Sequence, residues 1–360
     1  MDKIKEFLKS KVVQIIAWCL LFACAAVLIY NGITVENLSN GLVLFMAIIT
    51  AISAVVIFVK KMLKWTKTKP FWSPLFEGFF IDLFSQTEYN VSMKPFVKWA
   101  GGKTQLLNEI AKYFPQEYNN YYEPFVGGGA VLFNFRPHNA YINDINSQLI
   151  NAYEWIKKDP NFIFQSVSLL DVPETSKEGY NWLRDLYNRG IDEPSDGSAV
   201  LFIWLNKHCF NGLYRVNSKG RFNVPWNKKK KIKSIDEENI YEINRYLQDV
   251  SISNLDFEEF CSNVKENDFV YFDSPYLPES KTADFTSYTK NGFNLEEHKR
   301  LASLYKKLNE KGAKLLLSNN NVPLIYSLYE GFSIHPINVK RAINSNGNKR
   351  NGKEVLITNY

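Results

Sequence analysis

The sequence predicts an α/β protein, in which helices cover an open sheet, preceded by a two-helix membrane segment. Helical stretches such as residues 296–312 alternate with strand candidates such as residues 313–319, and this alternation is typical of α/β folds. Further upstream, residues 121–135 read as a short strand, a glycine turn and the start of a helix. The chain has 360 residues, 46% of them hydrophobic, which is enough for more than one domain.

The N-terminus differs in composition from the rest of the chain. Residues 12–30 and 42–59 carry no charge, and each is about long enough to cross a ~30 Å hydrocarbon core as a helix. Lysines precede the first run and follow the second, whereas the connection between them has none, so the positive-inside rule places both ends in the cytoplasm. We therefore expect a transmembrane helical hairpin over residues 1–65 and an aromatic-rich connector over residues 66–92.

Charge and cysteine content constrain the function only loosely. Lysine and arginine total 43 against 37 acidic residues, and the net charge of +6 is a weak indication of a polyanionic partner. The four cysteines form no Cys-x-x-Cys pair and no zinc-like spacing, so we expect a reduced compartment and no bound metal. His208 and Cys209 are adjacent but lack further candidate ligands, and we expect structural roles for both.

A glycine turn indicates a nucleotide-containing ligand. Gly127, Gly128 and Gly129 follow a short strand, and glycines there let the backbone turn tightly and approach a ligand. The segment 140–146 follows one helix later and contains Asp144, where a carboxylate typically accepts hydrogen bonds from ribose hydroxyls. The spacing is shorter than in the dinucleotide fingerprint, and Gly-x-Gly-x-x-Gly is absent, which disfavours a nicotinamide enzyme.

The stretch "NDFVYFDSPYLP", residues 267–278, reads as a buried strand that stops at Asp273, Ser274, Pro275 and Tyr276. A strand that ends in Asp-x-Pro is common, so this tetrapeptide has no assigned chemistry when it is taken alone. A second site that requires such a tetrapeptide would change that interpretation.

Several motifs supply this second site. The segments "KPFVKWAGGK", "EPFVGGGAV", "DINSQLI", "FNGLYRVNSKGRFNVP" and "DSPY" follow one another in this order. Together they resemble the Dam-type DNA adenine-N6 methyltransferases, and the resemblance covers residues 93–360. It implies a Rossmann-like S-adenosylmethionine-dependent methyltransferase sheet with an inserted, mainly helical target-recognition domain. The catalytic domain would comprise residues 93–151 and 246–360, and the recognition domain residues 152–245.

The resemblance implies methyl transfer from S-adenosylmethionine to the N6 amino group of an adenine that has been flipped out of duplex DNA. An exocyclic amine is a poor nucleophile because its lone pair is delocalised, so the site must accept hydrogen bonds from both N–H groups. Asp273 would accept one, and the backbone carbonyl of Ser274 the other, while Tyr276 stacks on the base. Pro275 is the remaining member of the catalytic tetrapeptide. The family usually has Asp-Pro-Pro-Tyr, from which Ser274 departs. Because the expected role of residue 274 belongs to its backbone carbonyl, serine can fulfil it in place of proline.

The remaining site residues also follow from the resemblance. Trp99 and Lys103 would hold the cofactor, the lysine facing its methionine carboxylate, and Asp144 would bind its ribose. The full set expected to bind the cofactor is Trp99, Lys103, Phe125, Gly127, Gly129, Asp144, Asp256, Phe257 and Asp273. The set expected to bind DNA, at a GATC-type site, is Lys98, Phe210, Asn211, Leu213, Arg215, Pro225 and Lys228.

Other interpretations stay open at this point. The chain could methylate RNA or protein, or be a membrane-tethered DNA-binding protein with weak or no catalysis, which residues 12–59 and Ser274 would favour. We expect a cytoplasmic catalytic part anchored in the cell membrane by residues 12–59. Because the resemblance begins at Met93, translation could instead start there, and the anchor would then be absent. A cognate restriction endonuclease is a further candidate partner.

Overall fold

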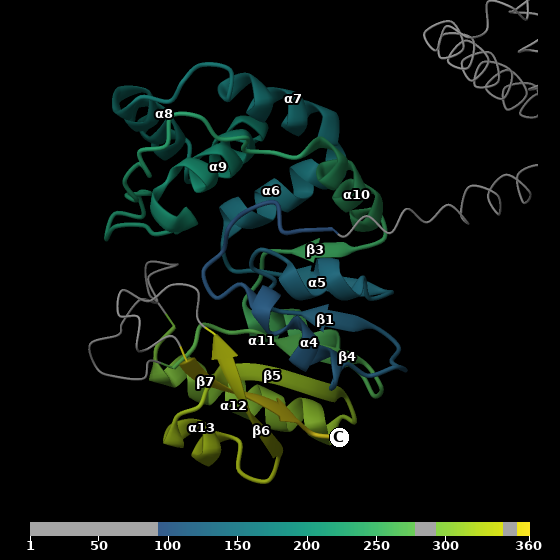
Figure 1. Cartoon of the computed structure of the whole chain (residues 1–360). Helices are drawn as coiled ribbons and strands as arrows, with labels where there is room; N and C mark the ends of the chain where they lie inside the picture. Colours follow the sequence, from purple (N-terminus) through teal and green to yellow (C-terminus); the bar gives the residue numbers. More distant parts are fainter. Residues whose placement is uncertain (1–92, 278–292, 341–350) are drawn as a thin grey trace, which may run out of the picture. The chain divides into compact units, whose positions relative to one another are not determined.

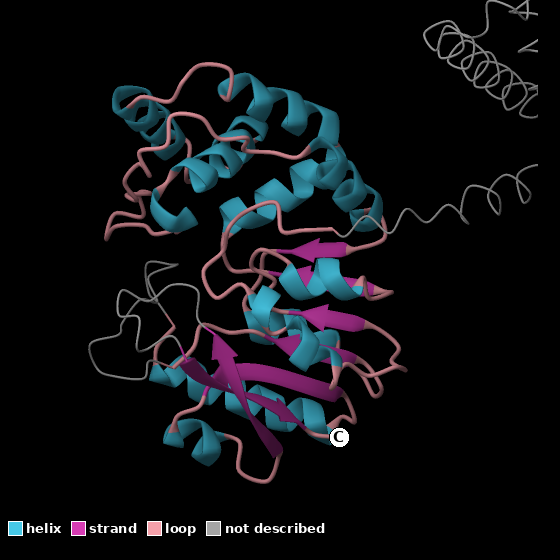
Figure 2. Cartoon of the chain, viewed as in Figure 1, coloured by secondary structure: helices cyan, strands magenta, loops and turns pink. Residues whose placement is uncertain are grey.

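A seven-stranded sheet forms the centre of the chain (Figures 1 and 2). The computed structural model describes residues 93–277, 293–340 and 351–360, so the predicted membrane hairpin and connector lie outside the described residues. The strand order is β3-β2-β1-β4-β5-β7-β6. The strands are β1 (Tyr121–Glu123), β2 (Ala140–Asn143), β3 (Ser251–Ser253), β4 (Phe269–Phe272), β5 (Lys314–Asn320), β6 (Ser333–Lys340) and β7 (Asn351–Thr358).

Strands β3, β2, β1, β4 and β5 pair in parallel, and β7 runs antiparallel between β5 and β6. The predicted α/β sheet is therefore confirmed, and its order is consistent with the methyltransferase sheet that the resemblance implies. Parallel pairing brings the carboxyl ends of β1, β2, β4 and β5 to one edge of the sheet. The chain leaves β1 towards β2 and later returns to β4 on the other side, and ligands of open α/β sheets bind at such a switch point.

Helices follow most of the strands and also form a separate group between β2 and β3. They are α4 (Leu107–Ala111), α5 (Ala130–Phe135), α6 (Ser147–Lys158), α7 (Pro160–Leu170), α8 (Lys177–Arg189), α9 (Asp196–His208), α10 (Glu237–Leu247), α11 (Phe257–Phe260), α12 (Leu295–Glu310) and α13 (Pro323–Leu328). Helices α6 to α10 gather beyond the β3 edge of the sheet (Figure 1). No helix among the described residues is long and apolar enough to cross a membrane.

The core lies on both faces of β4. All residues of β4 are buried, as expected for a strand that is covered on both sides. Phe269 and Tyr271 belong to one hydrophobic cluster, and Val270 and Phe272 belong to another, because successive side chains of a strand point to opposite faces. The first cluster continues into α6 and α9, where it includes the fully buried Trp204. The helical group therefore shares its core with one face of the sheet.

Candidate functional site

An ion pair joins the predicted cofactor lysine to the predicted catalytic aspartate. Lys103 Nζ lies 2.6 Å from Asp273 Oδ1, and the side chains are 5% and 18% exposed. The same ammonium donates to the carbonyl oxygen of Gly101 at 2.6 Å and lies 4.5 Å from the centroid of the Tyr276 ring. Ser318 on β5 donates its hydroxyl to Asp273 Oδ1 at 3.1 Å. Lysine, aspartate and tyrosine thus form one cluster at the carboxyl end of β4.

Burial and the neighbouring groups have opposite effects on the pKa of Asp273. Burial raises the pKa of the Asp273 carboxyl above its usual value, while the Lys103 ammonium and the Ser318 hydroxyl act to lower it. Glu123, at the carboxyl end of β1, is 2% exposed, and burial raises its pKa well above the usual value. The Tyr121 hydroxyl donates to Glu123 at 2.8 Å. The charges of Asp273 and Asp144 raise the pKa of Glu123 further, while the Tyr121 hydroxyl and the Lys103 ammonium act to lower it.

The glycine turn lies under Trp99 and is fixed by Asp144. Gly127 has φ +51°, and a Cβ atom at this position would lie 2.8 Å from Trp99 Cδ1. The Gly127 amide donates to Asp144 Oδ2 at 3.1 Å, and the Asn146 amide donates to Oδ1 at 2.9 Å. Burial raises the pKa of Asp144 to about 6, and these two amides act in the opposite direction. The turn therefore places an acidic group beside a backbone that only glycine permits.

Three aromatic rings border the same edge of the sheet. Phe125, just before the glycines, lies 5.4 Å from Phe257 and 5.8 Å from Phe293, measured between ring centroids. Asp256 caps α11 by accepting from the Glu258 amide, and it also pairs with the Arg300 guanidinium at 2.9 Å. The structure thus brings Phe257 to Phe125 and commits the Asp256 carboxylate to partners within the chain.

The loop that carries Trp99 is hydrogen-bonded to the predicted recognition domain, residues 152–245. Asn206 on α9 accepts from the Lys98 amide at 2.7 Å and donates to the Lys98 and Gly212 carbonyls at 2.8 and 3.1 Å. The Trp99 ring stacks on Tyr214 with the centroids 5.7 Å apart. The predicted cofactor residues and the predicted DNA residues are therefore neighbours, although they are far apart in the sequence.

The predicted DNA residues share one exposed loop system. The Phe210 amide donates to the Pro225 carbonyl at 2.8 Å, and the Phe210 ring is 51% exposed. Asn211 and Lys228 are exposed and have φ values of 56° and 66°. Arg215 is also exposed, and its Nε donates to Asn223 at 2.9 Å. Leu213, in contrast, is half-buried against the core.

His208 has a structural environment. It is 1% exposed and stacks on Trp204 with the centroids 3.9 Å apart. Its Nε2 lies 3.0 Å from the Ser234 hydroxyl, and its Nδ1 lies 3.2 Å from the Thr175 hydroxyl. Within the described part of the chain, no group of three or more histidine, cysteine or acidic side chains is arranged to hold a metal ion.

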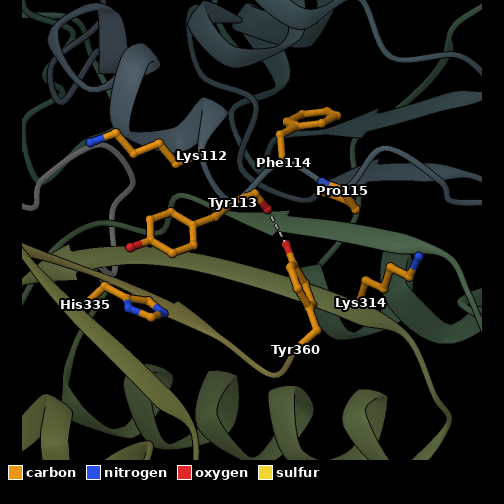
Figure 3. A pocket seen from close by; sticks show the side chains of 7 residues that line it. All are labelled: Lys112, Tyr113, Phe114, Pro115, Lys314, His335 and Tyr360. Carbon is orange, nitrogen blue, oxygen red and sulfur yellow. Dashed lines mark hydrogen bonds between the residues drawn. The ribbon is translucent and has the colours of Figure 1, made fainter.

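A pocket of about 370 Å³ lies elsewhere on the molecule (Figure 3). It is lined by Lys112, Tyr113, Phe114, Pro115, Lys314, His335 and Tyr360. Lys314 begins β5, whereas Ser318 near the end of that strand contacts Asp273. The pocket is thus at the amino edge of the sheet and is separate from the Lys103 and Asp273 cluster.

Sequence reasoning did not identify Glu123, Ser318 or Glu354. Glu123 is the first residue of the quoted segment "EPFVGGGAV" and ends a strand, and Ser318 lies in the strand candidate 313–319. Both could have been found from the rule that ligands bind at the carboxyl ends of parallel strands. The Tyr276 hydroxyl donates to Glu354 on β7 at 3.0 Å, a contact that no local signal indicates.

Comparison with known proteins gives consistent matches. The family model described as D12 class N6 adenine-specific DNA methyltransferase matches residues 99–343. The type II methyltransferase M.MjaIII of Methanocaldococcus jannaschii is 44% identical over 289 residues, which cover 75% of this chain and 100% of that protein. The type II methyltransferase M1.LlaDCHI of Lactococcus lactis is 44% identical over 278 residues, covering 75% of this chain and 96% of the relative. The DNA adenine methylase of Escherichia coli is 35% identical over 268 residues, covering 74% and 95%.

A buried hydroxyl in the tetrapeptide gives a testable prediction. Ser274 is 1% exposed, and its Oγ has no hydrogen-bond partner among the described residues. Because an unpaired buried hydroxyl costs about 1 to 3 kcal/mol, Ser274→Ala should raise the free energy of unfolding by roughly 1 kcal/mol. Denaturant titration of both proteins measures this difference. A clear loss of stability in Ser274→Ala would show that the hydroxyl is paired.

Proposed function

Because the chain belongs to the D12 class of N6 adenine-specific DNA methyltransferases, we propose that Asp273 is the group that accepts a hydrogen bond from the target amine. The protein is a site-specific adenine DNA methyltransferase, and its family implies S-adenosylmethionine as the methyl donor. The observation that carries the proposal is the cluster of Lys103, Asp273 and Tyr276 at the carboxyl end of β4.

Asp273 suits this task because it is a hydrogen-bond acceptor whose side chain is only 18% exposed. Its carboxylate is held by the Lys103 ammonium and the Ser318 hydroxyl, so its orientation is set before the substrate arrives. The backbone carbonyl of Ser274 would accept the second N–H of the amine, and Tyr276 would stack on the extruded base. The bound cofactor supplies a methyl group on a positively charged sulfur, which makes a metal ion unnecessary for this transfer.

The residues around the glycine turn fit a cofactor with a nucleoside. The Asp144 carboxylate can accept from ribose hydroxyls, and its pKa of about 6 leaves it mostly ionised at neutral pH. Phe125 and Phe257 lie together and offer an apolar contact for an adenine ring. Lys103 would reach the cofactor's carboxylate from its place beside Asp273. Trp99, over Gly127, would close the site from the recognition side.

We assign target recognition to residues 152–245, with residues 93–151 and 246–360 as the catalytic domain. The exposed Phe210 and Asn211 would enter the duplex around the flipped base, and Lys98 would contact the first guanine. Arg215, Leu213 and Pro225 would read a GATC-type site. The exposed lysine run that begins at Lys228 would neutralise phosphates.

A partnership with a restriction endonuclease is a further part of the proposal. Two of the similar proteins are named type II methyltransferases, and the third is named a DNA adenine methylase. RNA or protein substrates are less well supported. The family description and the name of the Escherichia coli relative both specify DNA as the substrate. Membrane association through residues 12–59 stays a prediction, outside the described residues.

Replacing Asp273 by alanine tests the catalytic role. Single-turnover methylation of duplex DNA should fall by at least about 100-fold, because positive charge develops on the amine nitrogen and the variant lacks the charged acceptor that stabilises it. Cofactor affinity, measured by calorimetry, should change much less. Near-normal turnover in Asp273→Ala would show that another group activates the amine.

Asp144 gives the proposal a pH dependence. Its folded-state pKa is raised from 3.8 to about 6, so the carboxylate gains a proton as the pH falls through that value. Cofactor affinity should therefore weaken several-fold between about pH 7.5 and about pH 5, as the acceptor for the ribose is lost. In Asp144→Asn the affinity should be low throughout and nearly independent of pH. The same pH dependence in both proteins would exclude Asp144 as its source.

Arg215 tests the target sequence. Its planar guanidinium can pair with both major-groove acceptors of a guanine, which discriminates by about 1 to 3 kcal/mol against a wrong base. Methylation of duplexes that differ from GATC at one base pair should become less selective at a single position in Arg215→Ala. Lys228→Ala is the matched control, which should weaken binding to all duplexes and reduce its salt dependence. Preferred methylation of another motif by the unaltered protein would overturn the GATC assignment.

A further inference from the structure

We propose that Glu354 on β7 is a positioning residue that orients Tyr276 for the extruded base. The Tyr276 hydroxyl donates to Glu354 Oε2 at 3.0 Å, and Glu354 is 8% exposed. The inference rests on the proposed stacking role of Tyr276 and deepens it, because it names the residue that holds the ring.

The ring of Tyr276 needs a fixed plane to receive a base. Rotation of a tyrosine ring about its Cβ–Cγ bond is only weakly restricted by the side chain itself, so its contacts must set the plane. One face of the ring carries the Lys103 ammonium, 4.5 Å from the centroid. A base can therefore stack on the other face. The hydroxyl lies on the Cβ–Cγ axis, so a partner there fixes the direction of that axis and the position of the ring, while the contacts on the ring face set its plane.

Glu354 can serve as this anchor because its backbone is fixed on both sides. In the sheet it pairs with Asn320 of β5 and with Ile337 of β6. The residue after Tyr276 is held by the same region, since the Leu277 amide donates to Asn319 Oδ1 at 3.1 Å and its carbonyl accepts from Asn320 Nδ2 at 2.5 Å. Strands β5 and β7 thus fix both the backbone beside Tyr276 and its hydroxyl.

The protonation state of Tyr276 agrees with this role. Burial raises the pKa of the phenol well above its usual value, and the nearby carboxylates of Asp273 and Glu354 raise it further. The hydroxyl therefore keeps its proton at neutral pH and remains a donor. A carboxylate acceptor makes this a charge-assisted hydrogen bond, a type that is stronger than a neutral one.

A double-mutant cycle tests the proposal. Single-turnover methylation is measured at saturating cofactor and duplex DNA for Glu354→Ala, Tyr276→Phe and the double variant. Each single variant should be slower by about 10-fold, the size expected for one charge-assisted hydrogen bond, and the double variant should be no slower than either. Glu354→Gln keeps an acceptor oxygen and should recover most of the rate. Thr358→Val, a substitution at a buried position of the same strand, should leave the rate unchanged.

Each other outcome has a definite meaning. Additive losses, or an unaltered rate in Glu354→Ala, would overturn the role of Glu354. If Glu354→Ala unfolds at the assay temperature, the cycle is repeated with Glu354→Leu, which removes the acceptor but fills the space, and whose failure to couple with Tyr276→Phe would also overturn the role of Glu354. Asp273→Ala is assayed alongside, because near-normal turnover there would contradict the proposed catalytic centre and would leave the coupling between Glu354 and Tyr276 unaffected.

Discussion

The ion pair between Lys103 and Asp273 is the interaction on which the other features of the site depend. Asp273, Asp144 and Glu123 all lie at the carboxyl edge of the sheet, and burial raises the pKa of each. An isolated carboxylate in such a place would gain a proton, since desolvation disfavours its charged form. Lys103 is the cation that opposes this at Asp273, at a distance of 2.6 Å.

The fold supplies the contacts that place this pair. Lys103 follows the Trp99 loop, which is bound to α9 through Asn206, and Asp273 ends a strand that is buried on both faces. The sheet therefore fixes the acid, and the helical group fixes the loop that leads to Lys103. Trp99 also stacks on Tyr214, so this loop contacts the predicted recognition domain.

Much of the fold follows from local sequence patterns, whereas the contacts within the site do not. The apolar run before Asp273 predicted β4, and the glycines before α5 predicted the turn that Asp144 holds. The insertion of β7 between β5 and β6 has no local signal, so Glu354 could not be placed beside Tyr276 in advance. Likewise, only the folded chain shows that Asp256 is paired with Arg300. Local sequence propensity predicts individual helices, strands and turns. The long-range pairing of strands determines which polar side chains contact one another.

The pH dependence of single-turnover methylation in Lys103→Met tests the central claim most directly. Saturating cofactor separates the effect on Asp273 from any loss of cofactor affinity. If the lysine keeps Asp273 ionised, its removal raises the pKa of that carboxyl, and the acidic limb of the rate profile should move to higher pH. A slower enzyme whose acidic limb stays at its original pH would show that Lys103 does not control the charge of Asp273.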